Sequence, residues 1–173
     1  MKPVVVTRDD VFDVLEQVMD PEVPVLSVVE LGIVRDVRMD DGGDGSAMGV
    51  TVVVTPTYSG CPAMRVIEHD IAAALEARGV SPVRIETVYA PAWTTDWLTD
   101  EARRKLAAYG IAPPSARDAE PDLVPIGRRR TSPLCPLCGS ANTRVESEFG
   151  STACKSIVHC NDCGQPFEYF KSI

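Results

Sequence analysis

Two short cysteine motifs near the end of the chain constrain its fold more than any other feature. The motifs are CPLCG at residues 135–139 and CNDCG at residues 160–164, and 21 residues lie between their inner cysteines. Two residues between cysteines let one tight turn direct both sulfur atoms at the same ion, and the glycine that follows permits the left-handed backbone that closes the turn. Two such turns supply four thiolates in a tetrahedron. We therefore predict that one metal ion is bound by Cys135, Cys138, Cys160 and Cys163.

A four-sulfur site favours Zn²⁺, and the residues between the motifs can form the β-hairpins of a zinc ribbon. Iron is the alternative metal, since a rubredoxin-like site uses similar turns. Four cysteines leave no open position for catalysis, so we expect a structural metal that holds together a module of about 40 residues. Cys154 lies between the motifs. It is either a fifth thiol near the metal or a small residue inside a ribbon strand.

Composition narrows the class of protein. Hydrophobic residues make up 45% of the 173 residues and charged residues 24%, which is typical of a folded chain. The net charge of -8 argues against a nucleic-acid or anionic-membrane partner, because such partners need a basic face. The sequence has neither an apolar run of about 20 residues nor a secretory signal at its start. We expect a cytoplasmic protein whose cysteines stay reduced and available for metal.

The charge and proline patterns divide the chain into parts. Residues 1–110 hold 18 acidic and 10 basic residues, whereas residues 111–173 hold 7 of each. Residues 111–133 contain five prolines and lack apolar periodicity, which is typical of a semi-extended linker. We predict a mixed α/β domain (α+β, two layers) over 1–110, a linker over 111–133 and a zinc ribbon over 134–173. Proteolysis should cut the linker at the arginines of residues 128–130.

Apolar spacing and capping residues predict the elements of the first domain. Apolar spacing gives helices over residues 8–19, with Thr7 as N-cap, and over 62–78. A third helix is expected over 99–109, because Thr99 is a plausible N-cap and Gly110 suits the end. Runs of β-branched residues predict strands over 28–39, with a bend at Gly32, over 50–55 and over 83–89. The order α-β-β-α-β-α over about 110 residues can form a small two-layer domain.

Cys61 is the one cysteine of the first domain, and it precedes Pro62, a favoured first residue of a helix. This puts Cys61 at or near the N-cap, where free N–H groups and the helix dipole would favour the thiolate. Cys61 is then a nucleophile, redox sensor or soft metal ligand, or else an inert small residue. Three acids, Asp20, Glu22 and Glu30, either line a pocket with Cys61 or serve only as caps and turns. Trp93 and Trp97 either cover the core or anchor a partner.

Several of these segments resemble the small domain of iron–sulfur maturation factors of the SufT type. They are Asp20-Pro21-Glu22, Glu30-Leu31-Gly32 and the stretch from Thr55 to Gly60-Cys61-Pro62. The rest of the chain narrows the resemblance to the PaaD family, the D subunits of phenylacetyl-CoA epoxidase systems. It contains residues 89–97, then a linker, and then a four-cysteine ribbon that ends in CGQPFEYFK at 163–171. The resemblance covers nearly the whole chain.

This resemblance implies an accessory role in aerobic phenylacetate degradation. In such systems a di-iron oxygenase epoxidises the ring of phenylacetyl-CoA and receives electrons from a reductase with a flavin and an iron–sulfur cluster. The sequence has neither the Glu-x-x-His pairs of a di-iron site nor a GxGxxG nucleotide motif, so we expect no catalysis by this chain itself. The resemblance implies help with assembly of the iron–sulfur cluster or metal centre in the partner subunits. Cys61 matches the functional cysteine of the family, and Asp20 matches the acid of its motif.

Two functions compete at this stage. In the first, the chain is a maturation factor, and Cys61 with Asp20 holds iron or an iron–sulfur cluster transiently. One thiolate cannot hold a cluster stably, so a bound cluster would be labile or shared between two chains in a homodimer. In the second, the chain is a structural adaptor that docks on the oxygenase through its ribbon and tryptophans. A nucleic-acid-binding ribbon is disfavoured, because residues 111–173 carry no net charge.

Overall fold

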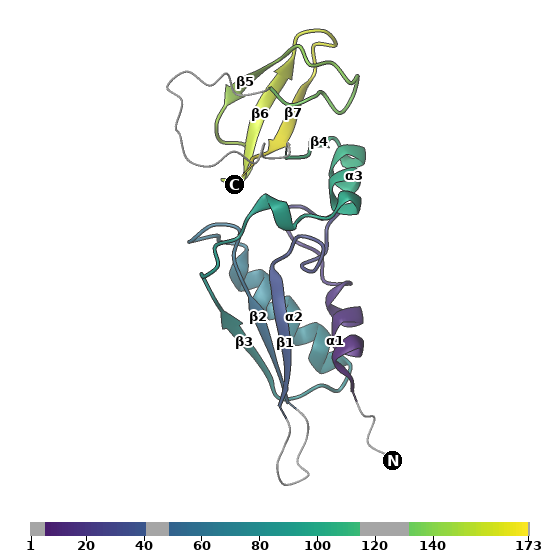
Figure 1. The fold of residues 1–173 in the computed structure, drawn as a ribbon, viewed down its shortest axis with the longest axis vertical. Helices are drawn as coiled ribbons and strands as arrows, with labels where there is room; N and C mark the ends of the chain where they lie inside the picture. The colour runs from purple at the N-terminus through teal and green to yellow at the C-terminus, as the bar shows by residue number, and fades with distance from the viewer. Residues whose placement is uncertain (1–5, 41–48, 115–131, 173) are drawn as a thin grey trace. The chain divides into compact units, whose positions relative to one another are not determined.

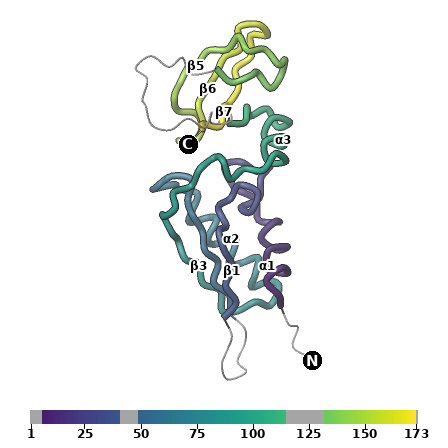
Figure 2. Tube along the Cα trace, in the orientation of Figure 1, coloured from purple at the N-terminus to yellow at the C-terminus, as the bar shows by residue number. Residues whose placement is uncertain are grey.

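The computed structural model describes residues 6–40, 49–114 and 132–172. The chain folds into two compact units that divide between Trp93 and Thr94 (Figures 1 and 2). The first unit contains helices α1 and α2 and strands β1 to β3, and the second contains α3 and strands β4 to β7. The mixed α/β class of the first domain and the small β module with four cysteines are as predicted.

The first unit begins with α1 (Arg8–Leu15), which starts at Thr7 as the sequence predicts. The Thr7 hydroxyl accepts a hydrogen bond from the Asp10 N–H at 3.2 Å, and the Asp10 carboxylate accepts one from the Thr7 N–H at 2.8 Å, which forms a capping box. The helix ends earlier than the predicted residue 19. The chain turns out of the helix because Met19 pairs with Ser27 in an isolated bridge, and the N–H of Asp20 bonds to the carbonyl of Leu26 at 2.9 Å.

A three-stranded sheet forms the centre of the first unit. β1 (Val34–Asp40) pairs antiparallel with β2 (Gly49–Val54), and β2 pairs parallel with β3 (Val83–Thr87). The crossover between β2 and β3 is α2 (Met64–Ala77), which lies beside the sheet (Figure 1). The buried apolar face of α2 consists of Met64, Ile67, Ile71 and Leu75. β1 starts later than predicted, because Val28 to Ile33 form local turns in which the carbonyl of Val28 accepts from Ile33 and Val34.

Three loops meet at one edge of this sheet. β2 and β3 are parallel, so the chain leaves both strands at the same edge, where antiparallel β1 begins. The Thr55 N–H bonds to the carbonyl of Ile33 at 2.8 Å, and the Trp93 indole N–H bonds to the carbonyl of Leu31 at 2.9 Å. The Val88 N–H bonds to the carbonyl of Val54, at the end of β2, at 2.8 Å. These bonds bring together the loops of residues 20–33, 55–63 and 88–93. Asp20, Glu22 and Glu30 lie in the first of these loops, and Cys61 lies in the second.

The second unit contains a short 3₁₀ turn, η1 (Thr95–Trp97), then α3 (Asp100–Tyr109) and a four-stranded sheet. Its strands are β4 (Ile111–Ala112), β5 (Thr143–Ser147), β6 (Lys155–Cys160) and β7 (Pro166–Phe170), in the order β4-β7-β6-β5. The three long strands form antiparallel pairs, whereas β4 runs parallel to β7. A small buried cluster packs against Tyr169 and consists of Ala112, Cys135, Val158, Cys160 and Phe167.

The unit boundary differs from the predicted one at residue 110. The predicted third helix is present as α3, but Gly110 ends it with φ 93°, and the next two residues pair at once with β7. Ile111 and Ala112, which the sequence assigned to the linker, therefore belong to the ribbon sheet. Residues 115–131 of the predicted linker, including the arginines of the expected cleavage site, lie outside the described residues. In the described ranges, no helix has the length and apolar character needed to cross a bilayer.

Candidate functional site

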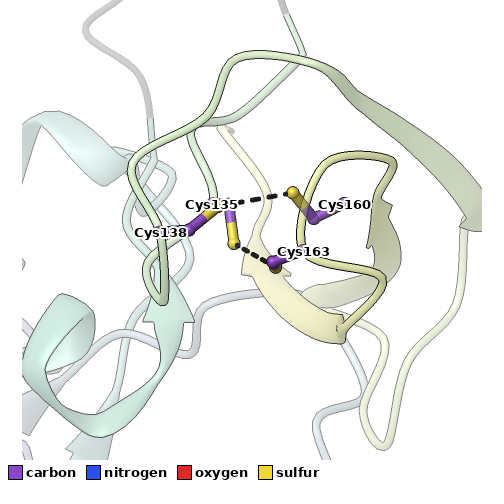
Figure 3. Close-up of side chains that lie close together, drawn as sticks. All are labelled: Cys135, Cys138, Cys160 and Cys163. Atoms are coloured by element: carbon purple, nitrogen blue, oxygen red, sulfur yellow. Dashed lines mark hydrogen bonds between the residues drawn. The ribbon is translucent and has the colours of Figure 1, made fainter.

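The two cysteine motifs form a pair of matching turns in the second unit. In each turn the N–H of the glycine bonds to the carbonyl of the first cysteine: Gly139 to Cys135 at 2.8 Å, and Gly164 to Cys160 at 3.0 Å. Both glycines have positive φ, 76° and 72°, as the sequence predicts for residues that close such turns. Figure 3 shows the four cysteines converging from the two turns.

The sulfur positions fit one tetrahedral metal ion. All four sulfur atoms lie within 4.8 Å of one another, with 3.8 Å between those of Cys135 and Cys163 and 3.6 Å between those of Cys138 and Cys160 (Figure 3). A metal–sulfur distance of about 2.3 Å requires sulfur atoms separated by about 3.8 Å in a regular tetrahedron. The four predicted cysteines therefore form one group of donors that could hold an ion.

The backbone around the sulfur atoms favours thiolates. The N–H of Cys163 lowers the pKa of Cys160 to about 7, with a smaller contribution from the N–H of Asp162. At Cys138 the N–H of Ser140 favours the thiolate, but burial and hydrogen bonds with the other three sulfur atoms raise the pKa to about 12. One thiolate therefore forms readily, and a full set of four requires a cation.

Cys154 is not part of this group. Its side chain is 4% exposed, and its sulfur atom lies 3.0 Å from the hydroxyl oxygen of Thr152. It immediately precedes β6, and the four clustered sulfur atoms of the described residues do not include it. This position fits the interpretation of Cys154 as a small buried residue of the ribbon.

Cys61 lies in the loop between β2 and α2, but it is not the N-cap. That position belongs to Ala63, and Cys61 stands two residues earlier in a turn where its N–H bonds to the carbonyl of Tyr58 at 3.3 Å. Burial raises the pKa of the Cys61 thiol, and the carboxylates of Glu22 and Asp20 raise it further. The N–H of Ala63 and the side chain of Tyr58 lower the pKa without reversing the direction. The expected thiolate character is therefore wrong for the protein without a bound cation.

The acids of the first loop have different surroundings. Asp20 is 5% exposed, and its Oδ1 atom accepts hydrogen bonds from the N–H groups of Glu22 at 2.8 Å and Val23 at 2.7 Å. The effect of Asp20 and Glu22 on the Cys61 pKa places their charge beside the thiol. Glu30 instead caps a turn, because its carboxylate accepts from the N–H of Ser27 at 3.1 Å and its own N–H donates to the Ser27 hydroxyl. The charges of Glu22 and Asp20 therefore act on the Cys61 thiol, although among the described residues only the four ribbon cysteines form a group that could hold a metal ion.

Sequence reasoning left the roles of three aromatic residues open or unnoticed. Trp93 is 4% exposed and bonded to Leu31, so it covers the core of the first unit. Trp97 is half-buried in the 3₁₀ turn of the second unit. Tyr58 was not predicted as a site residue, although its side chain bonds to Cys61. Its place three residues before the cysteine, in the same loop, was the available signal.

Two protein-family models match the chain in the two regions just described. Residues 8–87 match the family "Iron-sulfur cluster assembly protein", and residues 120–171 match the family "PaaD zinc beta ribbon domain". The first match covers the sheet, both helices of the first unit and Cys61. The second covers the four clustered cysteines.

Related proteins show how the two regions are combined. A protein of Porphyromonas gingivalis named "Fe-S protein maturation auxiliary factor" is 38% identical over 58% of this chain and 90% of its own length. A crystal structure of a domain of unknown function, DUF59, from Bacillus anthracis covers 57% of this chain and 90% of its own, with 27% identity and a TM-score of 0.51. The combination of both regions occurs in an Escherichia coli K12 protein provisionally named as the D subunit of 1,2-phenylacetyl-CoA epoxidase, which is 43% identical over 95% of this chain and 92% of its own length. The chain therefore belongs to the PaaD family, the D subunits of phenylacetyl-CoA epoxidase systems.

Proposed function

We propose that this protein is a cytoplasmic accessory subunit of a phenylacetyl-CoA epoxidase system in aerobic phenylacetate degradation. It assists assembly of the iron–sulfur cluster or metal centre in its partner subunits, the oxygenase and the iron–sulfur reductase. The proposal is supported by identity over nearly the whole chain to a protein named as the D subunit of such an epoxidase, and by the match of the first unit to iron–sulfur cluster assembly proteins. It assigns no catalytic residue of the epoxidation to this chain.

The observation that carries the proposal is the placement of Cys61 in a loop at the edge of the sheet, where the charges of Glu22 and Asp20 act on its thiol. The two carboxylates disfavour a bare thiolate at Cys61, because three negative charges would repel one another. The same charges favour a thiolate that is neutralised by a cation. A soft ferrous ion, or the edge of a cluster, would displace the thiol proton and bind Cys61 while the acids stabilise its charge. One thiolate per chain makes such binding transient, unless two chains share the cargo.

The ribbon holds a Zn²⁺ ion in this proposal. The matched family is named for zinc, and the sulfur separations fit the Zn–S distance. When bound, the ion neutralises the four thiolates and cross-links the two turns. The ion has no open position, so it contributes structure and not catalysis.

A structural adaptor is the second candidate function. Leu134 is 62% exposed and Leu137 is 59% exposed, and both lie at the first cysteine turn. Exposed apolar side chains on a rigid turn can anchor a partner protein. In this alternative the ribbon docks on the oxygenase and Cys61 is inert.

A substitution of Cys61 by serine separates the two functions. The epoxidase subunits are produced together with either the wild-type chain or Cys61→Ser, and the iron and sulfide content of the reductase and the rate of epoxidation are measured. We expect the variant to lower both values while the zinc content of the ribbon stays unchanged. Cys154→Ser is the matched control, because it changes a cysteine that lies outside the four-sulfur group.

Full cluster loading and full epoxidation with Cys61→Ser would contradict the maturation role. A combined Leu134→Ser and Leu137→Ser variant then tests the adaptor role. If docking explains the function, this variant loses co-purification with the oxygenase although Cys61 is intact.

A further inference from the structure

The two cysteine turns are joined by a set of polar side chains that the metal does not explain. This cross-turn network consists of Ser140 and Asn142, which follow the first turn, and Asn161 and Asp162, which lie inside the second. We propose that Asp162 is a positioning residue of the metal centre, and that the cross-turn network sets how fast the ion is released. The inference rests on metal binding by the four cysteines.

Asp162 makes the central contacts of the network. Its Oδ1 atom accepts a hydrogen bond from the Asn142 amide at 2.8 Å, and its Oδ2 atom accepts one from the Ser140 hydroxyl. The same hydroxyl oxygen accepts the N–H of Asn142 at 3.0 Å. One carboxylate of the second turn thereby holds two side chains that follow the first turn, and hydrogen bonds to a charged acceptor are stronger than neutral ones.

Asn161 adds a second set of bonds between the turns. Its N–H bonds to the carbonyl of Asn142 at 2.9 Å, and its side-chain amide donates to Asn142 Oδ1 at 3.0 Å. The side chain of Arg144 on β5 also donates to Asn161 Oδ1. The partners are 17 to 22 residues apart in the sequence, so these bonds join segments that no local turn would hold together.

The place of the network in the fold gives it a specific role. The ladder between β5 and β6 ends at the pair Thr143 and Cys160, and both cysteine turns lie beyond that end. Each turn is closed by its own backbone bonds, such as Cys135 N–H to the carbonyl of Ser140 and Cys160 N–H to that of Gln165. Neither bond fixes one turn against the other. Among the described residues beyond the ladder, the cross-turn network supplies hydrogen bonds that do so.

Metal release requires that sulfur atoms of one turn leave the ion while those of the other remain. With the cross-turn network intact, the departing sulfur atoms stay close and rebind. Without it, the turns separate more easily and a chelator reaches the ion sooner. Loss of a group that orients metal ligands from outside the coordination sphere costs about 10- to 100-fold in affinity. We expect the change to appear mainly in the rate of release.

The test measures metal transfer from the zinc-loaded full chain to excess EDTA, and the absorption spectrum of the cobalt-loaded chain. Asp162→Ala should release zinc about 10- to 100-fold faster and shift the cobalt–sulfur bands. Glu101→Ala is the matched control. Glu101 is also an exposed acid of the second unit, but its carboxylate pairs with Arg104 on its own helix and contacts no member of the cross-turn network that the structure describes.

A double-mutant cycle distinguishes positioning from a general loss of stability. Asn142→Ala should also speed zinc release. In the combined variant, release should be accelerated by less than the product of the two single factors, because both changes remove the same bond. The effects of Asp162→Ala and Glu101→Ala on the release rate should multiply, because the two residues share no bonding partner. If Asp162→Ala does not fold, Ser140→Ala and Asn142→Ala each remove one bond to Asp162 and should each speed release.

Release by Asp162→Ala within twofold of wild type, with an unchanged cobalt spectrum, would overturn the inference. The inference would also be overturned if the effects of Asp162→Ala and Asn142→Ala on the release rate multiplied fully. If Asp162→Ala does not fold, unchanged release rates in both Ser140→Ala and Asn142→Ala would overturn it. A wild-type chain that holds no metal would overturn the metal proposal and this inference together. A metal-loaded wild type with unaffected variants would overturn this inference alone.

Discussion

The two units of this protein are stabilised in different ways. The first buries a layer of aliphatic side chains between its sheet and helices, including Leu15, Ile67, Ile71 and Leu75. The compact cluster of the ribbon has five buried residues, and two of them, Cys135 and Cys160, belong to the sulfur group. The ribbon therefore uses its metal donors as part of its core. A small module that buries little apolar area can be stabilised by a metal cross-link instead.

The same difference appears in the polar interactions. In the first unit, polar side chains such as Thr7 and Glu30 cap helices and turns at the surface. In the ribbon, Lys155 is 5% exposed and forms an ion pair with Glu168 at 2.9 Å, and Glu168 also accepts from Ser151. A buried ion pair is costly unless its geometry is satisfied, so the ribbon depends on specific polar partners more than the first unit does.

Removal of one metal ligand should have the largest effect and should affect only the ribbon. Cys163→Ser changes an exposed cysteine, so little packing is lost with the ligand. Structural zinc contributes about 10 kcal/mol or more to folding of small domains. We expect the ribbon to unfold while the first unit keeps its structure, as measured by metal analysis and by NMR of the full chain. A folded ribbon without metal would contradict the statement that the ribbon, unlike the first unit, depends on a metal ion for its stability.

The buried ion pair of the ribbon gives the next largest effect. Glu168→Ala leaves the Lys155 ammonium buried without that carboxylate, which should cost about 3 kcal/mol. Urea unfolding of the cobalt-loaded chain, followed by its absorption, measures the loss. Lys155→Met combined with Glu168→Leu should recover most of the stability, because no charge is then buried. A double variant as unstable as Glu168→Ala would show that the pair is not the cause.

The ion pair also predicts a dependence on acid. Hydrogen bonds from Ser151 and Lys155 outweigh burial and hold the pKa of Glu168 below its ordinary value of 4.5. This carboxylate therefore stabilises the ribbon above pH 4.5, and the contribution is lost as the pH falls through its lowered pKa. Glu168→Gln should lose this part of the pH dependence in urea unfolding below pH 5. An unchanged acid profile would contradict the assignment.

A smaller effect is expected at the start of the first unit. Thr7→Ala removes one half of the capping box of α1 and should lower the free energy of unfolding by about 1 kcal/mol. Because Thr7 belongs to the first unit, zinc release from the ribbon should not change. Thermal unfolding and the EDTA assay on the same sample check both statements. A faster release would show that the two units are energetically coupled.

The smallest change concerns Cys61, where no loss of stability is involved. Burial and the nearby carboxylates raise the pKa of its thiol, so alkylation by iodoacetamide at pH 7 should be slower than that of free cysteine. The rate should rise about tenfold per pH unit until the pH reaches the raised pKa. Mass spectrometry of the zinc-loaded chain, with Cys61→Ser as the blank, measures it. Fast alkylation at pH 6 would indicate a thiolate and contradict the structure.

Local patterns predicted much of this molecule. The helix around Ile71 follows apolar spacing, and its face is buried as expected, whereas α3 was predicted from its caps, Thr99 and Gly110, which the structure confirms. Element ends were less predictable: α1 stops at Leu15 because a bridge between Met19 and Ser27 competes with the helix, and such a bridge leaves no periodic signal. β4 was missed for a similar reason. Two residues after a helix have no strand pattern of their own, and only the pairing with β7 makes them a strand.

The four-cysteine group was predictable from the chain alone, because CxxCG is a local motif whose two-residue spacing dictates where both sulfur atoms of each pair lie. The surroundings of Cys61 were not, since the charges of Asp20 and Glu22 reach it through loops that meet at the end of parallel strands. The hydrogen bonds that Asp162 accepts from Ser140 and Asn142 were equally unpredictable, because they depend on the register of β5 against β6. Local geometry follows from adjacent residues, whereas contacts between distant loops follow from strand pairing, which short-range spacing does not encode.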